Sequence, residues 1–243
     1  MADRREQESF NDVKHLNIKL QRDELAMNLG GGLPRNSLIL IEGKDGSGKS
    51  IFVQRLAYAL LLHEATVTYI STELNTISFI EQMESVDYDI KKYLLHDKLL
   101  FIPMFPLLGK TEFDQNFLDR LLLNPKLFEN DIIIFDTLSF LLVQNNIPQS
   151  KTFAVINFLK KAVTLGKIII FNVDPDHLNE QFLTLLRSVS DSFFTMQIKD
   201  FAGTMVRVIS VNRFKRPMGP FQNKIPFRIE PGKGLVIEIA SFD

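Results

Sequence analysis

The sequence predicts an α/β fold with a mainly parallel sheet, extended by antiparallel strands near the C-terminus. Short apolar runs alternate with stretches of helical periodicity over most of the 243 residues, which is typical of crossover units. A Gly-rich phosphate-binding pattern lies between the first apolar run and the first long helical stretch. After Asp191 the helical stretches stop, and short strand-like segments separated by turns follow one another.

Five segments are expected to form the parallel part of the sheet. The first, at 37–41, is a nearly continuous apolar run, as in a strand that is buried on both faces. The other expected strands are at 66–71, 99–103, 131–135 and 167–172. Because helical stretches connect them, these strands are expected to run in the same direction.

Helical spacing of apolar residues indicates the connecting helices. They are expected at 50–63, 76–95, 112–124 and 150–164, after a short helix at 23–29. The antiparallel extension is expected to consist of strands at 192–199, 204–212, 225–230 and 234–239. Residues 1–16 are polar and mixed in charge, which favours a flexible N-terminal arm. No repeat or linker divides residues 17–243, so we expect a single domain there.

Composition excludes several classes of function. A formal net charge of -1 provides no overall field that would attract nucleic acid or an anionic membrane surface. The absence of cysteine excludes disulfides, thiolate catalysis and Cys-ligated zinc, and the four histidines lack ligand spacing. The N-terminus is charged, and the longest apolar run, at 56–62, is too short to span a bilayer. We expect a cytoplasmic protein without direct membrane insertion.

The pattern G-x-x-x-x-G-K-S is the strongest functional signal. The pattern comprises Gly43, Lys44, Asp45, Gly46, Ser47, Gly48, Lys49 and Ser50, and Ile51, which follows it, is also expected to contact the nucleotide. Phosphate groups need several converging backbone N–H donors, and glycine lets the main chain curl closely enough to provide them. Lys49 would reach the β- and γ-phosphates of ATP, and the Ser50 hydroxyl would ligate Mg²⁺. Asp45 adds a carboxylate to this P-loop, so its side chain must point away from the phosphates.

Two carboxylates are candidates for the rest of the site. Asp136 follows four apolar residues at the end of an expected strand, where it would hold Mg²⁺ together with Ser50. Glu73 directly follows the second expected strand, where a general base for hydrolysis would lie. Alternatively, Glu73 caps the helix that starts near Asn75. Asn172, at another strand end, either senses the γ-phosphate or is a turn residue.

Together these motifs resemble the RecA/KaiC superfamily of ring-forming P-loop ATPases. The resemblance rests on Leu29-Gly30-Gly31-Gly32-Leu33-Pro34 before the first strand, the P-loop, Glu73, Asp136 and a C-terminal strand with alternating basic residues. It covers about residues 20–240. Within the superfamily the chain is most similar to the single-domain ATP-binding members of the archaeal flagellum (archaellum) motor. That similarity rests on chain length, Ser71-Thr72-Glu73-Leu74 and Val211-Asn212-Arg213.

The resemblance implies a hexameric ring with ATP and Mg²⁺ at the subunit interfaces. It also implies that the chain binds the hexameric ATPase of the archaellum motor, within a scaffold ring at the cytoplasmic membrane. In such proteins the nucleotide state regulates assembly rather than driving rotation. We therefore expect a regulatory component whose partners are copies of itself, the motor ATPase and the membrane-associated scaffold ring.

Two departures from the superfamily pattern bear on activity. KaiC-like ATPases carry two adjacent Glu after the second strand, whereas this chain has Glu73-Leu74, which implies slow or negligible hydrolysis. The basic pair Lys-x-Arg, which reaches across the ring interface in KaiC, is here Arg213-Phe214-Lys215. Residues two apart on a strand face the same way, so Arg213 and Lys215 would both contact a neighbour's γ-phosphate. Alternatively, the basic segment 207–233 is a solvated rim or a groove for DNA.

Two alternative functions stay open. A RecA-type recombinase or DNA-repair ATPase would need a basic loop that holds nucleic-acid phosphates. The candidate loop 144–149 is neutral and the loop 174–180 is acidic, so nucleic acid is not an expected partner. A KaiC-like autokinase would need a Ser or Thr near the γ-phosphate, and the sequence contains many of both.

Overall fold

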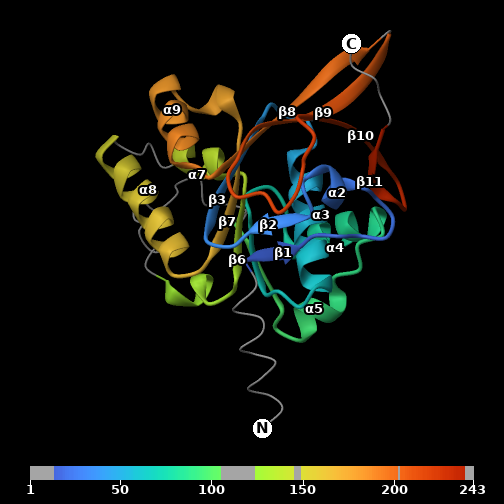
Figure 1. Cartoon of the computed structure of the whole chain (residues 1–243). Coiled ribbons are helices and arrows are strands. Elements are labelled where there is room, and N and C mark those ends of the chain that lie inside the picture. Colours follow the sequence, from blue (N-terminus) through green and yellow to red (C-terminus); the bar gives the residue numbers. More distant parts are fainter. Residues whose placement is uncertain (1–13, 105–123, 145–148, 202, 239–243) are drawn as a thin grey trace.

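The computed structural model describes residues 14–104, 124–144, 149–201 and 203–238, and within them a nine-stranded sheet is the main feature (Figure 1). Its strands are β3 (Ser37–Gly43), β4 (Val67–Ser71), β5 (Leu99–Pro103), β6 (Ile132–Asp136), β7 (Ile168–Val173), β8 (Ser192–Phe201), β9 (Thr204–Phe214), β10 (Lys224–Glu230) and β11 (Gly234–Ile237). A separate two-stranded sheet pairs β1 (His15–Asn17) with β2 (Gly32–Pro34).

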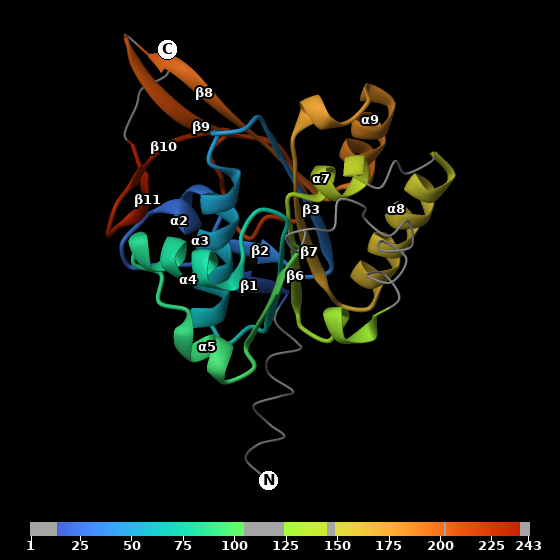
Figure 2. The ribbon, with the colours of Figure 1, turned by 180° about the vertical axis from the view of Figure 1, so that it is seen from behind.

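Helices connect most of these strands. They are α2 (Leu25–Asn28), α3 (Lys49–Leu62), α4 (Thr76–Ser85), α5 (Lys91–Leu95), α7 (Leu138–Gln144), α8 (Gln149–Thr164) and α9 (Glu180–Val189), with short 3-10 helices η1 (Pro125–Phe128) and η2 (Pro175–His177). α2, α3, α4 and α5 lie on one side of the large sheet, and α7, α8 and α9 lie on the other (Figures 1 and 2).

The large sheet has the order β11-β10-β9-β8-β3-β7-β6-β4-β5. The strands from β8 to β5 pair in parallel, and β9, β10 and β11 continue the sheet in antiparallel pairing. This confirms the predicted fold class. One detail differs, because β8 is predicted from the sequence to belong to the antiparallel extension. β8 is instead parallel to β3, since α9, a helix absent from the prediction, provides a crossover.

Burial explains why β3 is an unbroken apolar run. Ile39 and Ile41 belong to the hydrophobic cluster on the α3 side of the sheet, and Leu38 and Leu40 belong to the cluster on the α8 side. All four side chains are at most 1% exposed. A central strand with helices on both faces has no polar face, so alternation is absent from its sequence.

Several predicted boundaries were wrong. His15 and Leu16, assigned to the flexible arm, lie in β1, where Leu16 pairs with Leu33; the rest of the arm lies outside the described residues, apart from Lys14. The helix expected at 76–95 is two helices, α4 and α5, because the chain turns at Asp87 with a φ of 59°. The helix expected at 112–124 falls almost wholly outside the described residues. α7 was also missed, since its apolar residues follow β6 without a turn signal.

A buried ion pair attaches the N-terminal segment to the helix that follows the P-loop. Arg55, on α3, donates from Nε to Asp23 Oδ2 at 3.0 Å and from Nη2 to Asp23 Oδ1 at 2.5 Å. Its Nη1 donates to the carbonyl of Ile18 at 2.6 Å. Both charged side chains are 0% exposed. Because a buried charge needs its counter-charge nearby, the pair fixes the 18–23 segment against α3.

Replacing one partner of this pair should strongly destabilise the fold. Asp23→Asn leaves the Arg55 guanidinium buried without a counter-charge, at a cost of about 3–5 kcal/mol in the free energy of unfolding. Asp87→Asn is the matched control, because Asp87 pairs with Arg22 at 2.8 Å but is 69% exposed. Such a surface pair contributes about 0–1 kcal/mol. Urea unfolding of both variants measures the difference, and equal losses would contradict the assigned role of the Arg55–Asp23 pair.

Candidate functional site

The P-loop connects the carboxyl end of β3 to the first turn of α3. Gly48 precedes α3 with a φ of 93°, a left-handed conformation that glycine adopts without strain. A Cβ at Gly43 would lie 2.6 Å from the Ser47 Oγ and 2.7 Å from the carbonyl oxygen of Met196. Glycine is therefore required at Gly43 by close packing and not by a left-handed backbone. The loop ends on a helix N-terminus, where the dipole favours an anion.

Lys49 is largely buried and lies across the loop. Its Nζ donates to the carbonyl of Lys44 at 2.9 Å. Burial lowers the pKa of Lys49, and the nearby carboxylates, Asp174 first among them, partly oppose that shift. No carboxylate in the described ranges lies at hydrogen-bonding distance from this ammonium, and an anion bound at the loop would supply such a counter-charge.

Asp45 is exposed, as expected for a carboxylate that must point away from the phosphates. Its Oδ1 accepts a hydrogen bond from the backbone N–H of Gly46 at 2.8 Å. Next to it, Lys44 is also exposed and pairs with Asp176 at 2.8 Å. The side chains of Lys44 and Asp45 thus lie on the outer, solvent-exposed side of the loop, whereas Lys49 lies on its inner side.

Asp136, at the end of β6, accepts three hydrogen bonds. Ser50 Oγ and Asn172 Nδ2 donate to its Oδ1 at 3.0 and 2.7 Å, and the Tyr69 hydroxyl donates to its Oδ2 at 2.7 Å. Burial raises the pKa of Asp136, and these hydrogen bonds oppose the shift. Burial and the neighbouring Asp136 charge raise the pKa of Tyr69 well above its usual value, so its hydroxyl remains a donor.

This oxygen-rich group suits a magnesium ion. The structure brings together Ser50 and Asp136, the two residues that the sequence predicted as metal ligands. Asn172 Oδ1 is buried beside them and accepts no hydrogen bond from the described part of the chain. Carboxylate, hydroxyl and amide oxygens are the ligands that Mg²⁺ prefers, usually together with phosphate oxygens and water. The residues present therefore fit the cofactor.

Glu73 lies near this group on the loop after β4. Its Oε1 accepts a hydrogen bond from the Thr137 hydroxyl at 3.4 Å. Partial burial raises the pKa of Glu73, and the charge of Asp136 adds to that shift. The helix-capping alternative is wrong, because Asn75 is the N-cap of α4 and its Oδ1 accepts from the Ser78 N–H at 2.9 Å. Glu73 is left available for another role.

Arg213 and Lys215 do not approach the P-loop of their own chain. Arg213 pairs with Phe193 near the start of β8, and its Nη1 donates to the carbonyls of Arg187 and Ser190 at 2.6 and 3.1 Å. Lys215 Nζ lies 3.4 Å from Asp191 Oδ1, and its side chain is 53% exposed. Contact with a neighbouring subunit's nucleotide stays a prediction.

Arg207, on β9, contacts the P-loop and was not among the residues predicted for the site. Its Nε donates to the carbonyl of Gly46 at 3.2 Å, and its side chain packs near Gly48 beside Phe227. Arg187 also fixes Glu42, the residue before the P-loop. Its Nε donates to Glu42 Oε2 at 2.8 Å, and its Nη2 donates to Glu42 Oε1 at 2.6 Å. Arg207 belongs to a segment notable in the sequence only for its charge, and no local pattern indicates which basic residue of a strand faces a distant loop.

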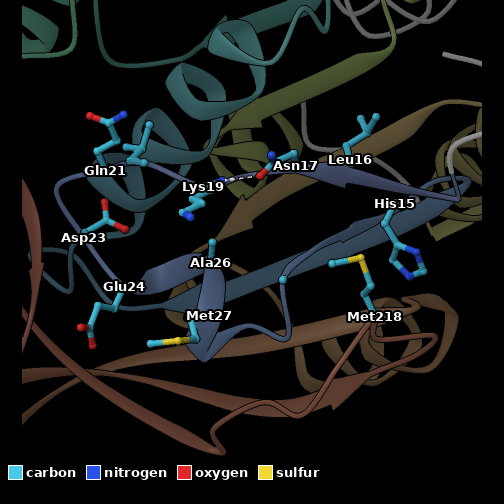
Figure 3. Close-up of a pocket in the computed structure, with 12 residues that line it drawn as sticks. His15, Leu16, Asn17, Lys19, Gln21, Asp23, Glu24, Ala26, Met27 and Met218 are labelled. Atoms are coloured by element: carbon cyan, nitrogen blue, oxygen red, sulfur yellow. Dashed lines mark hydrogen bonds between the residues drawn. The ribbon is translucent and has the colours of Figure 1, made fainter. Parts of the chain in front are cut away.

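Two cavities of the molecule differ in whether they adjoin the P-loop. One, of about 460 Å³, adjoins the P-loop between Lys44 and the β8 residues Thr195 to Ile198. The other, of about 740 Å³, lies between β1, α2 and Met218 (Figure 3). It contains no P-loop residue, and its lining mixes Lys19 with Asp23 and Glu24, so it does not provide a second phosphate cradle. No helix in the described ranges is both long and apolar enough to cross a membrane.

Comparisons with known proteins agree with this geometry. The family model of the KaiC ATPases matches residues 18–241. The archaeal flagellar ATP-binding protein FlaH of Methanocaldococcus jannaschii is 38% identical, over 92% of this chain and 96% of that protein. FlaH of Methanococcus voltae is 36% identical, over 94% of this chain and 99% of that protein.

Solved structures give the same result. The crystal structure of M. jannaschii FlaH superposes with a TM-score of 0.86 at 36% identity, covering 94% of this chain and 100% of that chain. A KaiC-like protein of Pyrococcus horikoshii has a TM-score of 0.72 at 16% identity, covering 93% and 99%, and shares the fold. The sequence, the P-loop geometry and these comparisons together show that the chain belongs to the KaiC-like ATPase family and, within it, to the FlaH family of archaeal flagellar ATP-binding proteins.

Proposed function

We propose that this chain is an ATP- and Mg²⁺-binding regulatory component of the archaellum motor, with slow or negligible hydrolysis. In this proposal residues 17–243 act as one domain, and ATP-dependent rings of it engage the motor ATPase within a membrane-associated scaffold ring. The protein would reside at the cytoplasmic face of the membrane. The observation that carries the nucleotide part is the 3.0 Å contact between Ser50 and Asp136 beside the P-loop. The motor context is supported by the names of the FlaH relatives.

Each part of the loop would have a separate task in binding. The backbone N–H groups of Gly48, Lys49 and Ser50 would surround the β-phosphate at the start of α3, because the Gly46 N–H already donates to Asp45. Lys49 would exchange its bond with the Lys44 carbonyl for the β- and γ-phosphate oxygens. Ser50 and Asp136 would hold Mg²⁺, which supplies charge neutralisation between the phosphates.

The first test is the affinity for ATP. Lys49→Ala removes a charge-assisted hydrogen bond of about 1.5–3 kcal/mol, so Kd should rise roughly ten- to hundredfold. Lys44→Ala is the matched control, because it removes the same charge from the outer side of the loop, where the ammonium pairs with Asp176. Calorimetric titration with ATP and Mg²⁺ compares the two variants. If both variants bind like the parent protein, the P-loop assignment is wrong.

The second test concerns turnover. Glu73 is the single acidic residue between β4 and α4, so we expect a steady-state rate far below the enzyme median of about 10 s⁻¹. Glu73→Gln should lower the residual rate without changing ATP affinity, because the amide cannot accept a proton from water. The parent's rate should also fall as the pH drops below the raised pKa of Glu73, and that pH dependence should vanish in the variant. A variant with the parent's rate and pH profile would exclude Glu73 as the base.

The ring proposal follows from charge. Bound ATP with one Mg²⁺ keeps roughly two negative charges at the mouth of the P-loop. A neighbour that offers Lys215 and Arg213 would form charge-assisted hydrogen bonds there. To reach a neighbour, the exposed Lys215 would break its 3.4 Å contact with Asp191. Arg213 would have to break two hydrogen bonds to backbone carbonyls. Loss of the γ-phosphate removes acceptors, so ADP should stabilise the interface less than ATP.

The third test is therefore assembly. Lys215→Ala should weaken ATP-dependent oligomers, and Arg213→Ala with Lys215→Ala should abolish them while nucleotide binding persists. Lys91→Ala with Lys92→Ala, on α5, is the control with the same loss of charge. Light scattering after size exclusion, with ATP and with ADP, gives the mass of each variant. Rings of the double variant, or equal assembly of the parent in ADP, would contradict the nucleotide-dependent interface.

A further inference from the structure

A basic cavity lies at the edge of the sheet where the parallel strands begin. Its volume is about 720 Å³, within the usual range for small-molecule sites. Among the described residues, those with charged side chains that line it are Lys14, Arg35, Lys167, Arg216 and a single carboxylate, Asp131. These residues come from the N-terminal segment, the segments before β3, β6 and β7, and the segment after β9. We name this feature the basic cavity.

The charge of this lining differs from that of the whole chain. Four cations against one carboxylate leave a formal charge of +3, whereas the complete sequence carries -1. The carboxylate is already engaged, because Asp131 Oδ2 accepts from the Thr66 N–H at 3.1 Å and from the Thr66 hydroxyl at 2.8 Å. Positive charge is therefore concentrated in one concave surface, where it raises the local concentration of anions.

Two of the cations are held in place without being neutralised. Lys167 Nζ donates to the carbonyl of Glu129 at 2.7 Å, and Arg216 Nη2 donates to the carbonyl of Asn36 at 2.8 Å. Carbonyl oxygens are neutral, and within the described ranges neither cation, nor Lys14, forms an ion pair with a carboxylate. An ammonium has three donors and a guanidinium five, so donors remain for a ligand.

The basic cavity is separate from the P-loop. Asn36 and Lys167 immediately precede β3 and β7, whose first residues, Ser37 and Ile168, are paired. The P-loop leaves from the other end of β3, roughly 20 Å away for a strand of this length. A nucleotide bound at the P-loop would not reach the basic cavity of the same chain.

The neighbouring cavity of Figure 3 serves as a comparison. It shares His15 with the basic cavity and has a similar volume of about 740 Å³. Its charged lining residues are Lys19, Asp23 and Glu24, so the formal charges nearly cancel. The accumulation of cations is therefore a property of the basic cavity and not of this end of the molecule in general.

We propose that the basic cavity is a second anion site, which binds a phosphate group. A tetrahedral dianion or trianion matches the +3 lining better than a single carboxylate does, and guanidinium groups bind phosphate oxygens in a bidentate manner. The phosphate can belong to a small soluble ligand or to the headgroup of an anionic lipid. Leu165, which is 72% exposed at the edge of the cavity, offers an apolar contact in the second case.

The test uses the full chain with its P-loop already saturated by ATP and excess Mg²⁺. Inorganic pyrophosphate is titrated by calorimetry, and vesicles of phosphatidylcholine with or without phosphatidylglycerol are tested by cosedimentation. The variant Lys14→Ala with Lys167→Ala removes two cations of the basic cavity. The control, Lys160→Ala with Lys161→Ala, removes two exposed cations from α8. Thermal melting of both variants verifies that they fold.

A soluble ligand is supported if pyrophosphate binds and the cavity variant weakens that binding about tenfold or more, with the control unchanged. A lipid headgroup is supported if only the phosphatidylglycerol vesicles retain the protein and the cavity variant is released from them. Both kinds of binding should weaken with increasing salt. The proposal is overturned if neither probe binds, or if the cavity variant and the control bind alike.

Discussion

The carboxylate of Asp136 is the constraint on which the centre of the structure depends. A buried charge is costly unless donors surround it, and here the donors come from three different elements: Ser50 on α3, Tyr69 on β4 and Asn172 on β7. They converge only if β7, β6 and β4 are adjacent and parallel and if α3 begins directly above them, which is the observed strand order. The strand order, the position of α3 and the donors around Asp136 therefore depend on one another. The buried Arg55–Asp23 pair acts in the same way on α3, because it fixes the N-terminal segment against that helix.

Much of this arrangement was predictable because its signals are local. An apolar run such as 37–41 requires helices on both faces, and Gly43 to Ser50 requires a strand before it and a helix after it. Asp136 and Glu73 were predictable because each lies at or just beyond the carboxyl end of a strand of the parallel sheet, and the carboxyl ends of such strands share one edge. For these residues, position along the chain was sufficient to predict position in space. Their roles in binding and hydrolysis stay proposals.

What the sequence did not reveal depends on long-range contacts. The hydrogen bonds of Arg213 to the carbonyls at the end of α9 require knowledge of α9, whose own signal was overlooked after the turn at Asp174–Glu180. The parallel pairing of β8 follows from the same helix. Arg207 and the basic cavity are further examples, because the cations that gather there are far apart in the chain. The number of charged residues can be read from a sequence, but where each charged side chain lies in the fold depends on long-range pairing of the strands.

The internal bonding of the P-loop bears on how a nucleotide would be received. The Gly46 N–H donates to Asp45, its carbonyl accepts from Arg207, and Lys49 donates to the Lys44 carbonyl. These bonds hold part of the loop in place, whereas the buried Ser47 Oγ has no hydrogen-bond partner among the described residues. Lys49 is the exception in electrostatic terms, because burial lowers its pKa and a neutral carbonyl is its direct partner. In the proposed complex, a phosphate would replace that carbonyl with a negative charge and offset the cost of burying the ammonium. This exchange would stabilise the nucleotide-bound state without any hydrolysis. An assembly that depends on bound nucleotide requires that property.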